Sequence, residues 1–206
     1  MILNAFDLKG KVAIVTGCDT GLGQGMALGL AEAGCDIVGI NIVEPTDTIA
    51  KVEALGRQFL SLKADVSKVD TLPALVDQAV SRFGRVDILV NNAGIQHVAP
   101  VHDFPVERWD AIIAINLSSA FHATRLALPA MRQADWGRII NVASVHGLVA
   151  SAEKSAYVAA KHGIVGLTKV TALENATTGV TCNAICPGWV LTPLVQKQVD
   201  AKAAAQ

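Results

Sequence analysis

The sequence is poor in charged residues and carries no large excess of either sign. Charged side chains make up 17% of its 206 residues, and 17 Lys and Arg balance 18 Asp and Glu. This balance excludes the broad basic surface that binds nucleic acid or an anionic membrane. Because hydrophobic residues make up 51%, the composition also excludes a disordered chain and predicts much buried surface, including surface between subunits.

Long apolar runs are absent as well. No uninterrupted apolar stretch approaches the roughly 18 residues that cross a bilayer. Asp7 and Lys9 follow only a few apolar residues at the N-terminus, which therefore lacks the long apolar core of a signal peptide. We expect a cytoplasmic protein that binds no membrane.

Cysteine and histidine form no recognisable metal-binding motif. The four cysteines are Cys18, Cys35, Cys182 and Cys186, and their spacing differs from that of zinc sites. The five histidines form no short ligand motif either. The sequence therefore predicts buried free thiols and no metal ion.

What the chain does contain is a regular alternation of strand-like and helix-like segments. Short β-branched runs predict strands over residues 11–16, 35–42, 58–62, 86–90, 138–143 and 180–185. Apolar residues at helical spacing predict helices over 22–33, 48–55, 71–83, 105–131 and 156–176, with another beginning at 194. Pro129 should bend or end the longest helix locally. The alternation predicts a single α/β domain over residues 1–206, built on a Rossmann-like, doubly wound parallel sheet.

Gly17, Gly21 and Gly23 lie between the first strand and the first helix. Glycines there let backbone amides approach a pyrophosphate at the helix N-terminus, where the helix dipole favours negative charge. A plain turn is the alternative. The position between a strand and a helix favours the nucleotide site.

The end of the second strand selects the cofactor in such a fold, because an acid there binds the ribose 2′-hydroxyl. Asn41 occupies this position, and no Lys or Arg occurs between Lys11 and Lys51 to neutralise a 2′-phosphate. The sequence therefore favours NAD over NADP.

Tyr157 and Lys161 are four residues apart in a helical segment, so their side chains share one face. The ammonium would favour the phenolate and lower the pKa of the tyrosine, which suits proton transfer. Ser144 ends the preceding strand and is placed to donate a hydrogen bond where charge develops. The alternative is a packed tyrosine beside a surface lysine.

Together these motifs resemble the short-chain dehydrogenase/reductase family over nearly the whole chain. Residues 16–23 match its glycine motif, 91–94 its Asn-Asn-Ala-Gly motif, and 187–188 its turn after the sixth strand. The four catalytic positions match Asn116, Ser144, Tyr157 and Lys161 in order. The resemblance implies that an enzyme of this family transfers a hydride to or from the cofactor NAD.

The resemblance also implies a role for each motif residue. Tyr157 exchanges a proton with the substrate oxygen, Lys161 lowers the tyrosine pKa and holds the nicotinamide ribose, and Ser144 orients the substrate. Asn116 anchors a water in the proton path. The residues it assigns to the cofactor are Gly17, Thr20, Gly21, Leu22, Gly23, Asn41, Asp65, Val66, Asn92, Ala93, Gly94, Tyr157, Lys161, Pro187, Gly188, Val190 and Thr192.

Two subfamilies share the resemblance. Residues 1–83 resemble the 2-deoxy-D-gluconate 3-dehydrogenases, also called 2-dehydro-3-deoxy-D-gluconate 5-dehydrogenases, and the chain from residue 92 onward resembles the D-3-hydroxybutyrate dehydrogenases. Because the second half of this fold binds the substrate, the resemblance favours interconversion of (R)-3-hydroxybutyrate and acetoacetate, with the deoxy-sugar acid as the alternative. The residues it assigns to this hydroxy acid are Gln96, Ser144, His146, Lys154, Tyr157, Trp189 and Gln198. Taken singly, most of these are equally typical of surface or packing side chains.

The family continues past this point with more helix, a seventh strand and a glycine-rich end. The chain is therefore expected to lack the last strand and the lid, which would leave a sheet edge uncovered. A truncated, inactive nucleotide-binding remnant is a further alternative. The family also implies a homo-oligomer, usually a tetramer.

Overall fold

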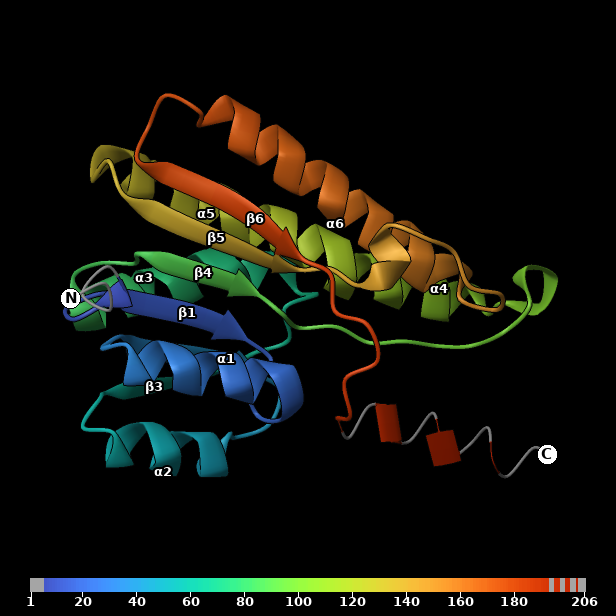
Figure 1. The fold of residues 1–206 in the computed structure, drawn as a ribbon, viewed down its shortest axis with the longest axis horizontal. Coiled ribbons are helices and arrows are strands. Elements are labelled where there is room, and N and C mark those ends of the chain that lie inside the picture. Colours follow the sequence, from blue (N-terminus) through green and yellow to red (C-terminus); the bar gives the residue numbers. More distant parts are fainter. Residues whose placement is uncertain (1–5, 193–194, 197–198, 201–202, 204–206) are drawn as a thin grey trace.

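The computed structural model describes residues 6–192, 195–196, 199–200 and 203. Six parallel strands form one sheet in the order β3-β2-β1-β4-β5-β6 (Figure 1). They are β1 (Val12–Thr16), β2 (Asp36–Asn41), β3 (Phe59–Lys63), β4 (Ile88–Asn91), β5 (Gly137–Val142) and β6 (Val180–Ile185). This is the Rossmann order, so the predicted fold class is confirmed. Much of the helix predicted from residue 194 lies outside the described residues.

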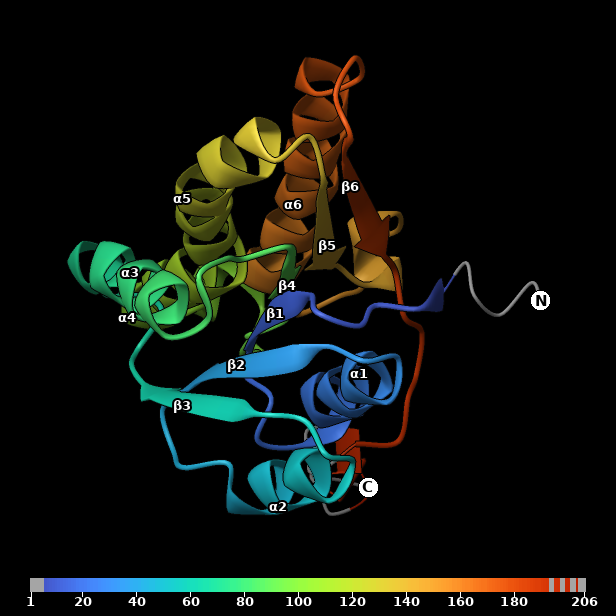
Figure 2. The ribbon, with the colours of Figure 1, turned by 90° about the vertical axis from the view of Figure 1, so that its left-hand side faces the viewer.

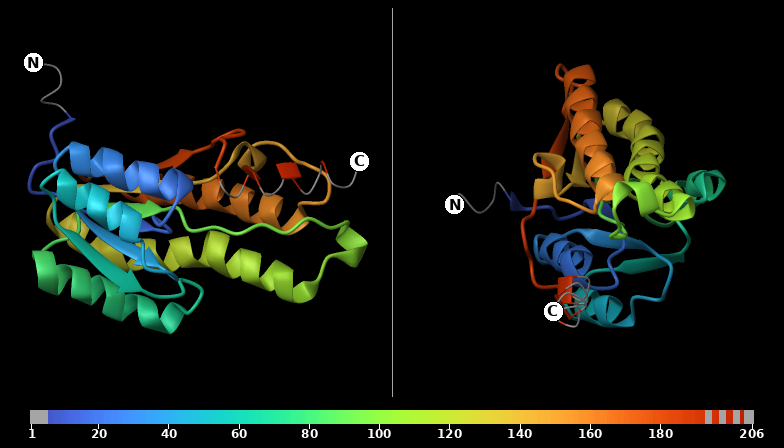
Figure 3. Two further views of the ribbon diagram at one scale, coloured as in Figure 1. Left: turned by 90° about the horizontal axis from the view of Figure 1, so that it is seen from below. Right: turned by 90° about the vertical axis from the view of Figure 1, so that its right-hand side faces the viewer.

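Helices cover both faces of the sheet (Figures 1 and 2). One side holds α1 (Gly21–Glu32) and α2 (Thr46–Ala54), and the other holds α3 (Leu72–Phe83), α4 (Val106–Ile113), α5 (Ser119–Gln133) and α6 (Ser155–Glu174). Alternation along β1 explains the two layers, because Ala13 and Val15 pack toward α1 and α2 while Val12 and Ile14 pack toward α3 and α5. Figure 3 shows the sheet between the two helical layers.

The longest helical stretch is less regular than the sequence predicts. α4 continues through a π-helical turn, η4 (Ala114–Ser118), into α5. Pro129 lies inside α5, yet the helix runs on to Gln133. Of the two alternatives expected, that Pro129 bends or ends the helix, the second is wrong, and the interruption lies at η4 instead. A π turn adds one residue to a helical turn and is frequent at functional sites.

The same stretch, Val106–Gln133, meets the length and hydropathy criteria for a membrane span, alone in the described part of the chain. The core helix of a layered protein meets the same criteria. Here the stretch lies in the helical layer (Figure 1), and 28% of its most apolar window is buried. Large apolar side chains of this stretch, among them Trp109 and Phe121, remain exposed.

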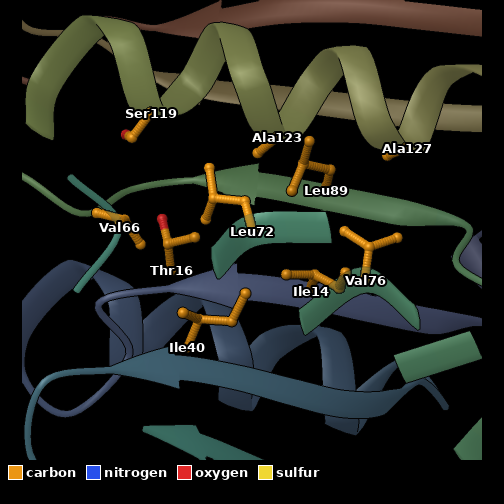
Figure 4. Close-up of a pocket in the computed structure, with 10 residues that line it drawn as sticks. All are labelled: Ile14, Thr16, Ile40, Val66, Leu72, Val76, Leu89, Ser119, Ala123 and Ala127. Atoms are coloured by element: carbon orange, nitrogen blue, oxygen red, sulfur yellow. The ribbon is translucent and has the colours of Figure 1, made fainter. Parts of the chain in front are cut away.

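A narrow void lies between the sheet and helices α3 and α5 (Figure 4). Its walls are mostly aliphatic side chains, with the hydroxyls of Thr16 and Ser119 toward one end. It has space for about one water molecule. The void is therefore a gap in core packing and not a binding site for an organic ligand.

The connection between β3 and β4 sets the position of the functional site. From β1 the chain moves outward to β2 and β3, then returns to β4 on the other side of β1. The carboxyl ends of β1 and β4 therefore border the crevice in which doubly wound sheets bind ligands. The segment after β6 runs across these strand ends toward α1 (Figure 1).

Candidate active site

A solvent-open cleft with a volume of about 560 Å³ runs along the carboxyl ends of the strands. Typical small-ligand pockets measure roughly 300–1,000 Å³, so this cleft has the size of a site for an organic ligand or cofactor. The sequence-predicted residues that line it are Gly17, Thr20, Gly21, Leu22, Gly23, Asn41, Asp65, Val66, Asn92, Ala93, Gly94, Ser144, Tyr157, Lys161, Pro187, Gly188, Val190 and Thr192. Segments from both halves of the chain thus meet in one cleft.

The turn between β1 and α1 requires glycine. Gly17 and Gly21 have φ angles of +65° and +58°, in the left-handed region that favours glycine. A Cβ on Gly23 would overlap the carbonyl oxygen of Gly17 and the side-chain nitrogen of Asn92. The first turn of α1 contains no acidic residue. Its amides and dipole therefore favour an anion with no carboxylate of that turn opposing it.

Asn92 braces the glycine turn. Its side-chain nitrogen donates to the carbonyl oxygens of Thr16 at 2.9 Å and Gly17 at 2.8 Å. In return, the Thr16 hydroxyl oxygen accepts from the backbone N–H groups of Asn92 and Ala93, both at 3.0 Å. The ends of β1 and β4 are thus locked together beneath the cleft.

Asn41 and Thr48 hold the same turn from the other side. Asn41 is 4% exposed, and its side-chain oxygen accepts from the Cys18 N–H at 2.7 Å. The Thr48 hydroxyl donates to the Cys18 carbonyl at 2.8 Å. Asn41 was assigned to the cofactor. Its side-chain oxygen is instead hydrogen-bonded to the glycine turn.

Two carboxylates line the end of the cleft beside β2 and β3, namely Asp19 and Asp65. Asp65 accepts from the Ser67 hydroxyl at 2.7 Å and from the Ser67 N–H at 2.9 Å. The hydrogen bond from the Ser67 hydroxyl, and to a smaller extent that from the Ser67 N–H, lowers the pKa of Asp65. This carboxylate is therefore ionised at neutral pH. Among the described residues that line the cleft, Lys161 is the single Lys or Arg, and it lies at the opposite end.

Ser144, Tyr157 and Lys161 meet at that opposite end. Ser144 follows β5, whereas Tyr157 and Lys161 lie one turn apart on α6. The Lys161 ammonium lies 5.5 Å from the centre of the Tyr157 ring and donates to the Val142 carbonyl at 2.6 Å. The Ser144 side chain is hydrogen-bonded to Tyr157, and its oxygen accepts from the His146 N–H at 3.1 Å.

Burial raises the pKa of Tyr157, and its hydrogen bond with Ser144 offsets this only in part. Lys161 is not among the groups that shift this pKa here, so its expected lowering of the tyrosine pKa stays a prediction. Burial lowers the pKa of Lys161 itself to about 8, although a charge interaction with Cys186 acts in the opposite direction. The ammonium is directed at the strand carbonyl of Val142, so the phenol keeps its proton at neutral pH.

Asn116 lies in η4 and is 1% exposed. Its side-chain oxygen accepts from the Ile95 N–H and its nitrogen donates to the Ile95 carbonyl, both at 2.9 Å. The amide therefore holds the segment that follows the Asn-Asn-Ala-Gly motif against the π turn. The water anchor implied for Asn116 stays a prediction.

His146, Lys154 and Trp189 lie close to Tyr157, beyond the residues that line the cleft. The His146 ring packs edge-on against Tyr157 at 6.1 Å between centroids. The Lys154 ammonium lies 5.0 Å from the centre of the Trp189 ring, and Lys154 is 8% exposed. Burial, and then the charge of Lys154, lower the pKa of His146, so the imidazole is neutral at neutral pH.

Gln96 is brought to the same region by backbone pairing. The segment that contains it forms a bridge between Ala99 and Lys154, and the Ala99 N–H donates to the Glu153 carbonyl at 2.9 Å. Gln198, the remaining residue assigned to the substrate, lies outside the described residues. Gln96, His146 and Lys154, all assigned to the substrate, are thus on segments that lie next to Tyr157.

Several residues that line the cleft were missed from the sequence. They are Asp19, Ile40, Ile42, Val43, Ala64, Ile95, Ile115, Val142, Ala143 and Val195. Asp19 stands inside the glycine motif, and its charge was a usable signal. The aliphatic residues were indistinguishable from core residues until the strand ends were placed.

The chain is similar to known proteins in both sequence and structure. The model of the short chain dehydrogenase family matches residues 11–203. D-beta-hydroxybutyrate dehydrogenase from Cupriavidus necator is 64% identical over 199 residues, 95% of this chain and 77% of that protein. The 2-dehydro-3-deoxy-D-gluconate 5-dehydrogenase from Escherichia coli is 50% identical over 208 residues, 100% of this chain and 82% of that protein. The crystal structure of levodione reductase matches with a TM-score of 0.91 at 33% identity, over 95% of this chain and 78% of that one.

Removal of the Ser144 hydroxyl should raise the pKa of Tyr157 further. Tyr157 is the single tyrosine of the chain, so the ultraviolet absorbance of tyrosinate reports its ionisation alone. Ser144→Ala removes the hydrogen bond that lowers this pKa, and the titration midpoint should move to higher pH. Ser151→Ala, a change at a serine that bonds only to its neighbouring carbonyl, is the control. An unchanged or lower midpoint in Ser144→Ala would contradict the assignment.

Lys161→Met should stabilise the fold near neutral pH. The lysine pKa falls from 10.5 to about 8 on folding. The unfolded chain binds more protons between these values, so stability rises with pH across that window. At about 1.36 kcal/mol per pKa unit, the burial penalty is on the order of 3 kcal/mol below pH 8.

Urea denaturation across this pH range measures the difference. The gain of Lys161→Met over the parent protein should be full near pH 7 and shrink as the pH rises toward 10.5. Lys169→Met, at an exposed position of the same helix, should change little at any pH. A Lys161→Met protein that is less stable than the parent at pH 7 would show that burial of Lys161 does not lower the free energy of unfolding.

Proposed function

This chain belongs to the short-chain dehydrogenase family, and from that membership we propose that it interconverts (R)-3-hydroxybutyrate and acetoacetate with NAD. It is an oxidoreductase that uses a nicotinamide cofactor. The observation that carries the substrate proposal is the buried Lys154 ammonium beside Trp189 and close to Tyr157. We place the activity in the cytoplasm, where the free cysteines of the described chain would stay reduced.

The charge of the cleft supports NAD rather than NADP. Asp19 and Asp65 line the end beside β2 and β3, where the adenosine half would bind. A 2′-phosphate there would meet two carboxylates and no cation among the described lining residues. The glycine turn and α1 suit the pyrophosphate, and Lys161 suits the nicotinamide ribose. When bound, the cofactor supplies a carbon that accepts or donates the hydride.

Tyr157 performs the proton transfer in this proposal. Its raised pKa keeps the phenol protonated at neutral pH, so it can donate to the oxygen of acetoacetate. Oxidation of hydroxybutyrate requires the phenolate, which accepts the hydroxyl proton. Ser144, hydrogen-bonded to Tyr157, orients the substrate oxygen. The chemistry therefore predicts that a rise in pH increases the rate of oxidation relative to the rate of reduction.

Lys154 and His146 bind the substrate carboxylate in this proposal. A buried ammonium forms a strong, charge-assisted hydrogen bond with a carboxylate. The neutral imidazole of His146 adds a donor without a second charge. Trp189 forms an apolar wall beside Lys154 and suits the short carbon chain of a hydroxy acid.

The second candidate is oxidation of a deoxy-sugar acid. The Escherichia coli relative of that name is 50% identical over the whole chain. A sugar acid also carries a carboxylate and a secondary alcohol, so the same lysine and tyrosine would serve it. The higher identity, 64%, of the hydroxybutyrate dehydrogenase favours the smaller acid.

Formation of NADH tests these alternatives directly. The purified protein should reduce NAD with (R)-3-hydroxybutyrate, more slowly with the (S) isomer, and poorly when NADP replaces NAD. Tyr157→Phe should lower turnover by at least about 100-fold, since general acid–base catalysis contributes 10²–10⁴-fold, and should still bind NAD. Turnover of the deoxy-sugar acid but not of hydroxybutyrate would reverse the ranking. NAD binding without turnover of any alcohol would favour the inactive remnant.

Lys154→Met should raise the KM for a hydroxy acid without a comparable effect on an uncharged alcohol. The methionine keeps the apolar stem but removes the charge, and a hydrogen bond to a charged group contributes about 1.5–3 kcal/mol. The KM should therefore rise by roughly 10- to 100-fold. Lys169→Met is the matched control on α6. Equal effects on charged and uncharged substrates would remove Lys154 from the substrate site.

We also propose that the protein is a homotetramer that buries the outer surfaces of α4, α5 and α6. Large apolar side chains are exposed there: Trp109 (38%), Phe121 (46%), Val170 (53%) and Leu173 (77%). Exposed apolar patches of this kind mark contacts between proteins. Light scattering should report four chains, and Phe121→Asp should yield a smaller species. A monomeric parent protein at micromolar concentration would contradict this proposal.

A further inference from the structure

A chain of hydrogen bonds crosses the buried face of the sheet behind the site. The Asn91 side-chain nitrogen, on β4, donates to the Asn141 side-chain oxygen, on β5, at 2.8 Å. The Asn141 nitrogen then donates to the Thr168 hydroxyl oxygen, on α6, at 2.9 Å. Thr168 completes the chain by donating to the Ile164 carbonyl at 2.7 Å. The three elements are therefore connected by direct and directional contacts.

These polar groups occupy positions where apolar side chains would ordinarily pack. Asn141 is 0% exposed, and Asn91 and Thr168 are each 6% exposed. Burying an amide costs free energy unless its hydrogen bonds are made, and here they are made in sequence. A satisfied buried network contributes mainly to the uniqueness of packing, because it is lost when the elements shift.

On β5 and on α6, the network lies at similar distances from the residues assigned to proton transfer. Ser144 is three residues beyond Asn141, or about 10 Å along an extended chain at ~3.3 Å per residue. Lys161 is seven residues before Thr168, or about 10.5 Å along a helix at ~1.5 Å per residue. Because α6 runs opposite to β5 (Figure 1), both spans point from the network to the cleft.

We infer that the Asn141–Thr168 hydrogen bond is a positioning contact, which sets where α6 lies along β5 and so where its reactive side chains lie. The inference rests on the proposed function, because it concerns the proton-transfer residues of that site. Besides Thr168, the buried face of α6 includes Ala156, Ala160, Lys161, Ile164 and Thr171. Lys161 also bonds to β5, at the Val142 carbonyl, so two directional bonds seven residues apart along α6 fix its register.

Thr124 on α5 provides a matched control. It is 5% exposed and accepts from the Asn91 side-chain nitrogen at 3.3 Å, within the same network. α5 carries none of Ser144, Tyr157 and Lys161. Thr124→Val and Thr168→Val therefore each remove one threonine hydroxyl of the network, at similar burial. Only Thr168→Val releases the helix that carries Tyr157 and Lys161.

The experiment compares Thr168→Val, Thr168→Ser and Thr124→Val with the parent protein. Thermal unfolding measures the loss of stability, NADH formation measures kcat, and tyrosinate absorbance measures the pKa of Tyr157. Since a displacement of about 1 Å can cost on the order of 100-fold in rate, a smaller shift predicts a loss of about tenfold in kcat for Thr168→Val. Its Tyr157 midpoint should also shift, whereas Thr124→Val should lose stability alone. Thr168→Ser, which keeps the hydroxyl, should restore both values.

Equal changes in kcat and tyrosine midpoint for the two valine variants would overturn the inference. So would a Thr168→Val protein that keeps both parental values. If either valine variant fails to fold, Thr168→Ala and Thr124→Ala repeat the comparison without the extra methyl group. The absorbance titration needs no substrate, so it distinguishes failure of this inference from failure of the proposed function, which would appear as a parent protein without turnover.

Discussion

The contact of the β1–α1 turn with the end of β4 is the constraint on which the rest of the site depends. Gly23 lies so close to Gly17 that no side chain fits between them, and Asn92 bonds across the gap. This contact places a helix N-terminus, a strand end and the Asn-Asn-Ala-Gly segment at one edge of the sheet. The cleft forms around it, with further lining from the ends of neighbouring strands, from Ile115 in η4, and from Tyr157 and Lys161 on α6.

Charge is divided along the cleft in a way that suits a ligand with distinct ends. Asp19 and Asp65 lie at one end, while Lys161 lies at the other, with Lys154 nearby. Both lysines are buried, at 4% and 8% exposure. Buried cations are costly unless a partner anion or carbonyl stabilises them. Lys161 donates to the Val142 carbonyl, yet burial still lowers its pKa to about 8, so this end of the cleft carries a cost in stability.

The fold and the composition of the cleft were predictable because they depend on local patterns. Alternating β-branched runs and helical periods located all six strands, and the glycine turn and Tyr157 marked the cleft. What the sequence could not show depends on distance and burial. The pKa of Tyr157 rises because of the surrounding protein, Asn41 bonds to a residue far away in sequence, and η4 has no local signal. Pro129 does not end α5, and the buried residues on either side of it, Ala127 and Met131, pack in the core.

The π turn at η4 makes this part of the chain tolerant of a change in length. A π turn holds one residue more than a regular helical turn, so loss of one residue there would leave an α-helical turn and keep the buried face of α5 directed at the sheet. The same loss inside α5 would turn every later side chain by about 100°. Over evolutionary time, a change in length by one residue should therefore occur at η4 more readily than inside α5.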